Sequence, residues 1–183
     1  HACVGFLLAP LAPAAVPRAG LYAALVLLAV LPDVDFLGDA LGIPYAHPLG
    51  HRGFTHSLVF AALAGVAAAA LFRGRITAIA GAQWRLGVVF FVATASHGVL
   101  DALTNGGKGV GFFIPLSNER FFFPWRPLAV TPLELDRLTA ADVAPILWSE
   151  FLWVWVPATV IAVAACRVRR CGNGLTARRR EQS

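Results

Sequence analysis

Residues 51–72 read HRGFTHSLVFAALAGVAAAALF, a short polar run followed by an uncharged segment that approaches the length of a membrane span. His51 and His56 flank Arg52 in the polar run, and Thr55 is predicted to cap the helix that follows. Imidazole side chains at the end of such a helix are costly to bury unless something binds them, and a divalent metal ion is the simplest candidate. The stretch therefore predicts a membrane helix with a metal-binding end.

Four more apolar segments lie on either side of this one, at residues 2–16, 19–31, 86–103 and 146–166. A spanning helix needs about 20 apolar residues, and 57–72, 86–103 and 146–166 approach or meet that length. Pro10 and Pro13 interrupt the first segment and Pro32 closes the second, so both are weaker spanning candidates. The sequence predicts an all-α fold, a helical membrane bundle with three to five membrane-embedded helices.

The composition also favours lipid over water as the surrounding medium. Hydrophobic residues make up 58% of the 183-residue chain and charged residues only 14%, whereas soluble domains carry about 25% charged residues. The mean hydropathy is +0.69. A large soluble helical core is the alternative interpretation. The cysteines are odd in number and have no zinc-ligand spacing, so neither a disulfide framework nor a cysteine metal site is predicted.

Residues 1–166 are predicted to form one membrane-embedded domain, and residues 167–183 a basic, disordered cytoplasmic tail. The tail directly follows an apolar segment, so an anchor at the membrane surface explains its arginines better than a nucleic-acid patch, and no nucleic-acid partner is expected. If all five segments cross the bilayer, ten of the 15 Lys and Arg residues fall on the side of the tail. The positive-inside rule then makes that side cytoplasmic.

The same topology places every candidate metal ligand at a non-cytoplasmic segment end. His97 and Asp101 are four residues apart, so both side chains lie on one helix face and can reach one ion or two adjacent ions. A His–Asp hydrogen bond that only stabilises the bundle is the alternative. In the Asp33-Val34-Asp35 run, one carboxylate is predicted to be a direct ligand and the other a bridging or supporting group. The predicted ligands are His1, Asp33, Asp35, His51, His56, His97 and Asp101.

Histidine and aspartate ligands without cysteine are typical of a catalytic rather than a structural zinc site. Such an ion lowers the pKa of bound water to about 7 and supplies a hydroxide nucleophile. Arg52 can clamp a phosphate or carboxylate, or it can simply neutralise the nearby aspartates. Glu150 falls on the same side, at the start of the last segment. The predicted catalytic residues are Asp35, Arg52 and Glu150, and the predicted cofactor is a divalent metal, Zn²⁺.

The connection from residue 104 to residue 145 is long and aromatic-rich. Asn105-Gly106-Gly107 predicts a turn, and phenylalanine and tryptophan side chains alternate with proline, arginine and lysine beyond it. Aromatic and basic residues together suit the headgroup layer of a bilayer. The connection is predicted to be an interfacial loop, either a lid or rim for the substrate or a plain anchor.

Three runs together resemble the bacterial membrane-bound metal-dependent hydrolase family (YdjM-like): LPDVD at 31–35, GHRGFTHS at 50–57 and SHGVLD at 96–101. His1 falls where that family has an N-terminal histidine, and residues 115–127 resemble one branch of it. The similarity covers nearly the whole chain apart from the basic tail.

The resemblance implies a distant similarity to zinc-dependent phospholipase C and P1-type nucleases, which are α-helical and hold zinc clusters. It implies that His97 and Asp101 form the His-x-x-x-Asp pair of those enzymes, that Asp33 or Asp35 bridges, and that His51 or His56 is another ligand. This chain has no histidine after His97 and no second such motif, so one or two ions are expected rather than three.

The expected function is that of an integral membrane hydrolase that cleaves a phosphoester or similar bond of a lipid or envelope substrate. The expected location is the bacterial inner membrane, with several spans, the site on the non-cytoplasmic side and membrane lipids as partners. Two alternatives stay open: a metal-binding protein without catalysis, such as a transporter or sensor, and a structural or interaction protein whose polar residues brace the helices. The sequence leaves the oligomeric state open.

Overall fold

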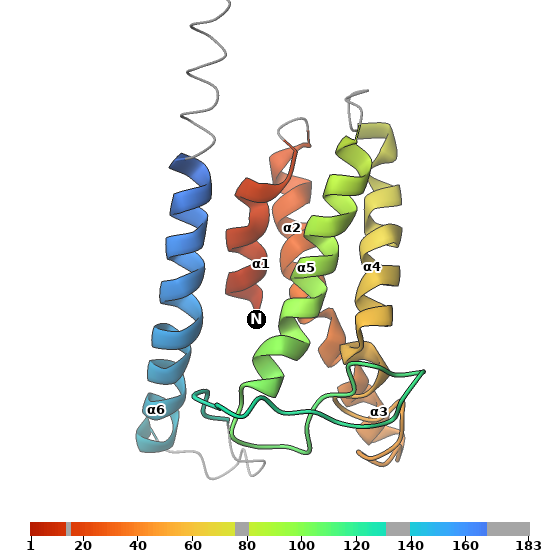
Figure 1. The fold of residues 1–183 in the computed structure, drawn as a ribbon, viewed down its shortest axis with the longest axis vertical. Helices are drawn as coiled ribbons and strands as arrows, with labels where there is room; N and C mark the ends of the chain where they lie inside the picture. Colours follow the sequence, from red (N-terminus) through yellow and green to blue (C-terminus); the bar gives the residue numbers. More distant parts are fainter. Residues whose placement is uncertain (14–15, 76–80, 131–139, 168–183) are drawn as a thin grey trace, which may run out of the picture.

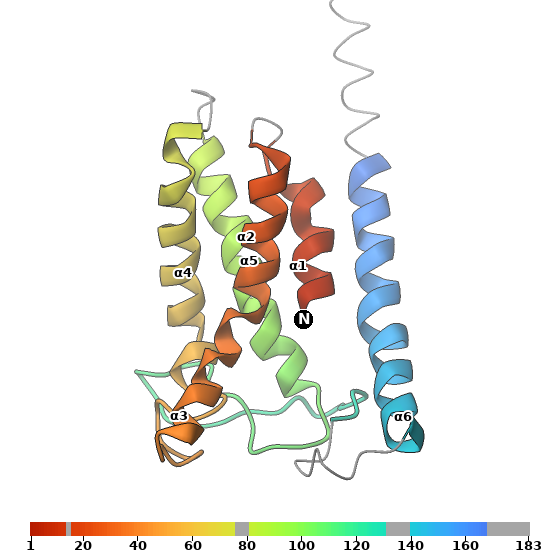
Figure 2. The ribbon, with the colours of Figure 1, turned by 180° about the vertical axis from the view of Figure 1, so that it is seen from behind.

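The computed structural model describes residues 1–13, 16–75, 81–130 and 140–167, and these form a bundle of helices that run alternately up and down (Figures 1 and 2). Within these ranges no β-strand forms, and the all-α prediction is confirmed. The α-helices are α1 (Ala2–Leu8), α2 (Arg18–Val30), α3 (Phe36–Ala40), α4 (Leu58–Leu71), α5 (Ala82–Ala102) and α6 (Ala140–Glu150). Shorter turns are η1 (Ala9–Leu11), η2 (Leu31–Asp35), η3 (Phe54–His56), η4 (Arg73–Arg75) and the π-helical η6 (Phe151–Trp155).

α5 forms the centre of the bundle and packs against α4, α2 and α1. Its inner face is apolar, and Leu86, Phe90 and Ala93 are fully buried. On α4, a Cβ added to Gly65 would lie 2.8 Å from the backbone nitrogen of Phe91, so only glycine allows this close approach of the two helices. Small residues serve the same purpose at other membrane helix contacts. The packing therefore fixes α5 firmly against α4.

Three helical runs are long and apolar enough to span a membrane: Arg18–Ala40, Ala82–Ala102 and Val143–Arg167. Two shorter apolar helices accompany them, Ala2–Leu11 and Leu58–Leu71. The number of membrane helices agrees with the prediction, but their lengths correct it. Pro32 does not close the second segment, because the chain continues through η2 into α3, and proline is tolerated at the start of a new turn, where its missing N–H is not needed. Segment 57–72 forms a helix of only 14 residues.

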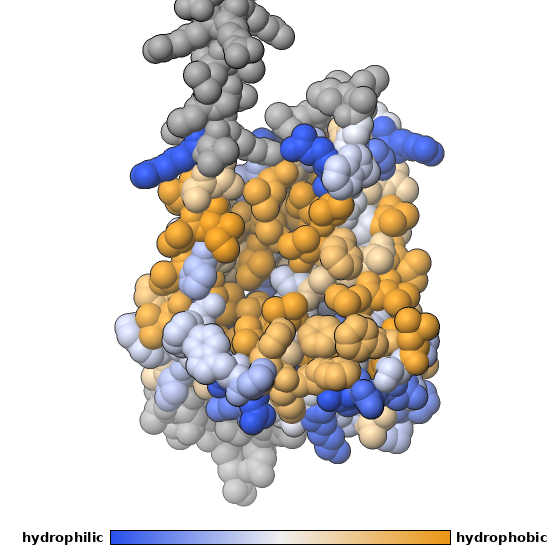
Figure 3. Space-filling model, in the orientation of Figure 1, coloured by the Kyte–Doolittle hydropathy of each residue, from blue (hydrophilic) through white to orange (hydrophobic). Residues whose placement is uncertain are grey.

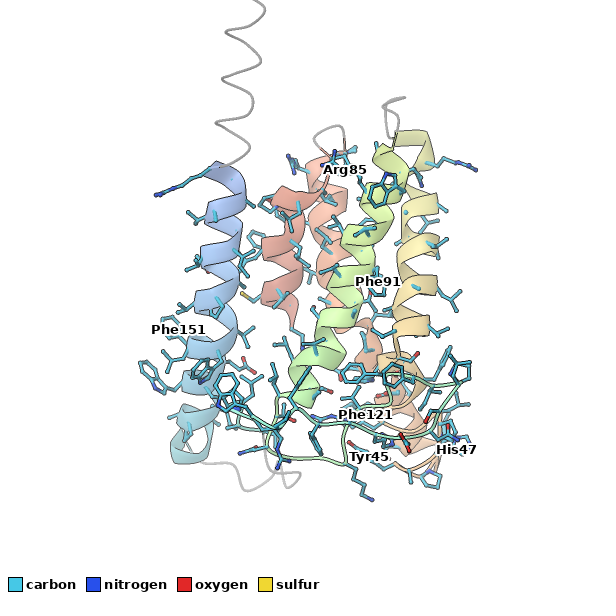
Figure 4. All side chains as sticks on the ribbon, in the orientation of Figure 1. Tyr45, His47, Arg85, Phe91, Phe121 and Phe151 are labelled. Carbon is cyan, nitrogen blue, oxygen red and sulfur yellow. The ribbon has the colours of Figure 1, made fainter. Side chains whose placement is uncertain are left out.

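The face of the bundle seen in Figure 3 carries an apolar belt between two hydrophilic ends. At one end lie the start of α2, η4, Arg85 and the end of the run that finishes at Arg167 (Figures 1 and 4). At the other end lie α3 and the two long connections, 41–57 and 103–130. Of the predicted basic tail, residues 167–183, only Arg167 lies within the described residues. The belt agrees with helices that cross a bilayer.

The connection 103–130 crosses the second end of the bundle (Figure 1). Val110 and Phe121 exchange two backbone hydrogen bonds of 2.9 Å, and Leu128 donates to the carbonyl of Leu103 at 3.2 Å. The predicted turn is present, with Gly107 at φ +85°. Phe113, Phe123 and Trp125 are exposed, in agreement with an interfacial loop. Part of the predicted loop, residues 131–139, lies outside the described residues.

Candidate metal centre

Histidine and aspartate side chains gather where α1, η2, η3 and α5 meet. They include two groups of three residues, and within each group the three ligand atoms lie within 4.8 Å of one another. The spacing of four residues on α5 places His97 and Asp101 on one face, the turn after Pro32 brings in Asp33, and η3 holds His56. The two groups are His1, His97, Asp101 and Asp33, His51, His56.

Contacts between the two groups join them into one cluster. His97 Nε2 lies 3.2 Å from Asp33 Oδ1, and His56 Nε2 lies 3.2 Å from Asp101 Oδ2. The His1 ring stacks on the His97 ring with 3.7 Å between centroids, and its Nε2 lies 3.5 Å from Asp101 Oδ1. Each carboxylate therefore faces an imidazole of the other group.

The hydrogen bonds of two histidines leave one ring nitrogen of each directed into the cluster. His97 Nδ1 lies 2.8 Å from the carbonyl oxygen of Ala29, so Nδ1 must carry the proton and Nε2 is left as an acceptor. His56 Nδ1 lies 3.1 Å from both Thr55 Oγ1 and Asp35 Oδ2. The buried Nε2 atoms of His56 and His97 make no hydrogen bond. Imidazoles that bind metals are held in this way, with the far nitrogen bonded to a carbonyl or carboxylate.

The donor set and its spacing fit a zinc ion. Ligand atoms about 2.0–2.1 Å from a tetrahedral zinc ion lie about 3.3 Å from one another. Within the group of His1, His97 and Asp101, the Asp101 carboxylate oxygens lie 3.5 Å from His1 Nε2 and 4.0 Å from His97 Nε2, close to that spacing. Nitrogen and carboxylate oxygen atoms without cysteine are the ligands of catalytic zinc sites. The residues present can therefore hold such an ion.

Asp35 lies behind two of the histidines rather than in either group of three. Its Oδ1 lies 2.8 Å from His51 Nδ1, and its Oδ2 accepts hydrogen bonds from the Arg52 amide at 3.0 Å and the Thr55 hydroxyl at 2.6 Å. It is buried, whereas the Asp33 side chain is 44% exposed. The two aspartates therefore have different contacts: Asp33 faces His97, and Asp35 orients His51 and His56. The predicted ligand and catalytic roles of Asp35 stay predictions.

Arg52 connects the cluster to the interfacial loop. Its Nε lies 2.9 Å from Asp101 Oδ2, and its Nη1 donates to Thr104 Oγ1 at 3.2 Å and to the Gly106 carbonyl at 2.9 Å. Its backbone is left-handed, with φ 59°, which is uncommon for a residue other than glycine. A Cβ at Gly107 would collide with the Arg52 guanidinium. The Arg52 side chain therefore pairs with Asp101 rather than with Asp33 or Asp35, and its predicted catalytic role stays a prediction.

His56 carries the clearest electrostatic signature outside the membrane-length helices. Burial alone would lower its pKa, but its contacts with Asp101 and Asp35 outweigh burial and raise the pKa of His56 above the usual value. Each carboxylate stabilises the imidazolium form. A metal ion bound at this position would replace that proton, because only the neutral ring is a ligand.

A cavity of about 160 Å³ opens beside the cluster. Arg52 and Asp101 line it on one side and Glu150, which is partly buried on α6, on another. The structure thus brings the last predicted catalytic residue, Glu150, to the same space. The remaining lining is His1, Leu100, Thr104, Leu128, Ala129, Val130, Ile146 and Val154.

Some contacts of the site were not predicted from the sequence. Thr55 is not the cap of α4, because Ser57 is, with its Oγ accepting from the Phe60 amide at 3.0 Å. Thr55 instead supports Asp35. Arg120 in the interfacial loop donates to the His51 carbonyl at 2.9 Å and to the Tyr45 carbonyl at 2.7 Å, which holds the His51 turn in place. No local sequence signal identifies Arg120, because its partners lie about 70 residues away.

Comparisons with known proteins indicate an inner membrane protein. The chain is 43% identical over 136 residues to the inner membrane protein YbcI of Escherichia coli (strain K12). The aligned residues make up 74% of this chain and 77% of that protein. No solved structure matches the chain. The implied similarity to phospholipase C and P1-type nucleases stays a prediction. The family model described as YdjM inner membrane protein matches residues 1–171. The chain therefore belongs to the YdjM inner membrane protein family.

Proposed function

We propose that this protein is a metal-dependent hydrolase of the inner membrane that cleaves a phosphoester bond in a lipid or envelope molecule. One observation carries the proposal: the buried Nε2 atoms of His56 and His97 lack hydrogen bonds and face carboxylates 3.2 Å away, beside a cavity that Arg52 lines. A buried ring nitrogen that lies 3.2 Å from a carboxylate oxygen without a well-aligned hydrogen bond is poorly satisfied. A bound cation would satisfy both atoms.

The two groups of three residues would hold one or two ions. When bound, a Zn²⁺ ion supplies Lewis-acid polarisation of a phosphoryl oxygen and a water molecule of lowered pKa. His1, His97 and Asp101 would hold one ion, and Asp33, His51 and His56 the other. Asp35 keeps the rings of His51 and His56 in position through its contacts with their Nδ1 atoms.

Arg52 and Glu150 would act on the substrate in the cavity. In hydrolysis an oxygen of water bonds to phosphorus, the bond from phosphorus to the leaving oxygen breaks, and a proton ends on that leaving oxygen. The Arg52 guanidinium balances the negative charge of the phosphoryl group. Glu150, at another part of the wall, is a carboxyl group that can take the proton from water and deliver it to the leaving oxygen.

The distribution of arginines supports a site on the non-cytoplasmic side. Arg18, Arg73, Arg85 and Arg167 lie at the end of the bundle opposite the cluster. By the positive-inside rule that end faces the cytoplasm. A substrate in the outer leaflet or in the envelope would then reach the cavity without crossing the membrane.

Metal analysis of the detergent-purified protein tests the proposal. The wild-type protein should retain one or two zinc ions per chain, whereas His51→Ala and His97→Ala should lose metal. His47→Ala is a matched control, because His47 is exposed in the same connection as His51 and takes no part in either group. A wild-type protein without metal, or a His97→Ala variant with its full complement, would refute the proposal.

A structural role of the cluster is the second candidate. Asp35, His56, Asp101 and Arg52 form a chain of contacts that ties η2, η3 and α5 together without any ion. If the network only braces the helices, a chelator should leave the unfolding temperature unchanged. If the network holds metal, the chelator should lower that temperature, because metal binding stabilises the folded state.

A further inference from the structure

The helical run Val143–Arg167, which includes most of α6 and all of η6, lies at the edge of the bundle. Only 11% of its apolar window is buried, compared with 50% for α5. In both ribbon views it stands beside α1 and apart from α4 (Figures 1 and 2). Among its described side chains, Val154 and Ala162 are the buried ones, and it packs against α1. The contact between this run and α1 is called the α1–α6 seam below.

Two hollows lie along the α1–α6 seam. The cavity of the metal centre occupies one end and is lined by His1, which directly precedes α1, together with Glu150 and Val154. A second hollow of about 270 Å³ occupies the other end, where Leu7 of α1 faces the last turns of the run. The lining of the second hollow is Leu7, Thr159, Ala162, Val163, Cys166 and Arg167. The N-terminal segment thus contributes His1 to the polar hollow and Leu7 of α1 to the more apolar one.

Aromatic side chains mark the depth of the metal centre in the membrane. Trp148, Trp153 and Trp155 are exposed on the first half of the run, close to the end where the interfacial loop lies. Trp125 of that loop packs edge-on against Trp153, with 4.5 Å between centroids. Tryptophan gathers at the boundary between lipid headgroups and acyl chains. The polar hollow therefore lies at headgroup depth, and the seam leads from it into the acyl layer.

We infer that the substrate is a phosphate-bearing membrane lipid, with its headgroup in the metal-centre cavity and one acyl chain along the α1–α6 seam. The inference rests on the proposed function, because it places the phosphate at the proposed metal centre. Pockets for drug-sized ligands measure about 300–1,000 Å³, so a cavity of about 160 Å³ admits a small headgroup and leaves the chains outside.

The chemistry of the two hollows matches the two parts of such a lipid. Arg52 and His1 line one end, where the Arg52 guanidinium and the ions of the proposed metal centre would attract a phosphate. Leu7, Ala162 and Val163 offer an apolar surface at the other. Only 11% of the apolar window of the run is buried, so in a bilayer the run beside the seam would be exposed to lipid on its outer faces. A lipid can therefore enter sideways without leaving the membrane.

Photolabelling of the full chain in lipid nanodiscs tests the inference without requiring activity. The probe is phosphatidylglycerol with a diazirine near the end of one acyl chain, and the control probe is diacylglycerol with the same chain. Phosphatidylglycerol should label Leu7, Thr159, Ala162 and Val163 about tenfold more than diacylglycerol does. It should also label them about tenfold more than Val160 and Ile161, which face lipid on the same run. Even labelling around the run, or equal labelling by both probes, would overturn the inference.

A pair of variants sharpens the test. Ala162→Trp fills the second hollow and should reduce labelling of Leu7 by about tenfold, whereas Val160→Trp adds the same side chain on an exposed face and should leave it unchanged. Metal analysis of the same samples separates the two proposals. Bound metal with even labelling would reject the seam and keep the metal centre. Seam labelling with the phosphate preference but no bound metal would keep the lipid site and reject the hydrolase.

Discussion

α5 and the run that contains α6 are both long and apolar enough to span a bilayer, yet they occupy opposite situations in the fold. Half of the apolar window of α5 is buried, and it carries His97 and Asp101 at its end. The other run is 11% buried and carries Glu150. The comparison teaches a division of labour. The proposed metal ligands, which must keep a fixed geometry, lie on the packed helix, and the group proposed to meet the substrate lies on the peripheral one.

The largest expected effect is on the rate of hydrolysis when Glu150 of the peripheral helix is replaced. Glu150→Gln keeps the size of the side chain but removes its ability to exchange a proton. The rate of phosphoester hydrolysis should fall by about 100- to 10,000-fold, while metal content stays at the wild-type level. Hydrolysis assays and metal analysis on the same preparation measure both. Loss of metal in Glu150→Gln would show that the proposed division between the two helices is wrong.

The next effect is on metal affinity at the packed side. Asp35→Asn removes the charge that orients His51 and His56 and should weaken zinc binding by about 10- to 100-fold. Competition with a chromophoric chelator measures the affinity. Asp39→Asn is the matched control, because Asp39 is exposed in the neighbouring α3. Equal affinities for the two variants would remove Asp35 from the site.

Substitutions at the contact of α4 with α5 and on the peripheral run should differ in their effect on the stability of the protein. Gly65→Val places methyl groups against the backbone of α5 at Gly87 and Phe91, and such overpacking should destabilise the protein by about 1–3 kcal/mol. Ala164→Val on the peripheral run faces lipid and should change stability by less than about 0.5 kcal/mol. Thermal unfolding in detergent measures both. A destabilised Ala164→Val variant would mean that the peripheral helix is packed as tightly as α5.

The smallest expected effect is on pH dependence. As pH rises, the metal-free protein should lose stability, whereas its affinity for metal should increase. The pKa of His56 is raised in the folded, metal-free protein, so its protonation stabilises that form fully below about pH 6.5, the usual histidine value. This stabilisation is lost as pH rises through the raised pKa. Metal affinity should instead fall as pH is lowered through the same pKa, because the proton competes with the ion. Unfolding temperatures with and without chelator across pH 5–8 should therefore diverge as pH rises, and parallel curves would count against competition at His56.

The gathering of ligands at one end of the bundle follows from the sequence, because helices that alternate in direction bring every second connection to the same side. His51, His56, His97 and Asp101 could be placed together for that reason. The end of the second segment could not be predicted, since Pro32 stops a helix in most contexts and here only begins a tighter turn. The roles of Thr55 and Arg120 depend on contacts with residues distant in sequence, which spacing does not encode.

The tighter turn at Pro32 also explains the proton on a distant histidine. In a continuous α-helix the carbonyl of Ala29 would accept the amide of Asp33, four residues on. After Val30 the chain continues as a 3₁₀ turn, whose hydrogen bonds run three residues back, and His97, 68 residues away, donates its Nδ1 proton to the Ala29 carbonyl. A break in one helix thus selects the tautomer of an imidazole on another. Straightening α2 by design would reclaim the carbonyl and leave His97 free to turn its other nitrogen toward the cluster.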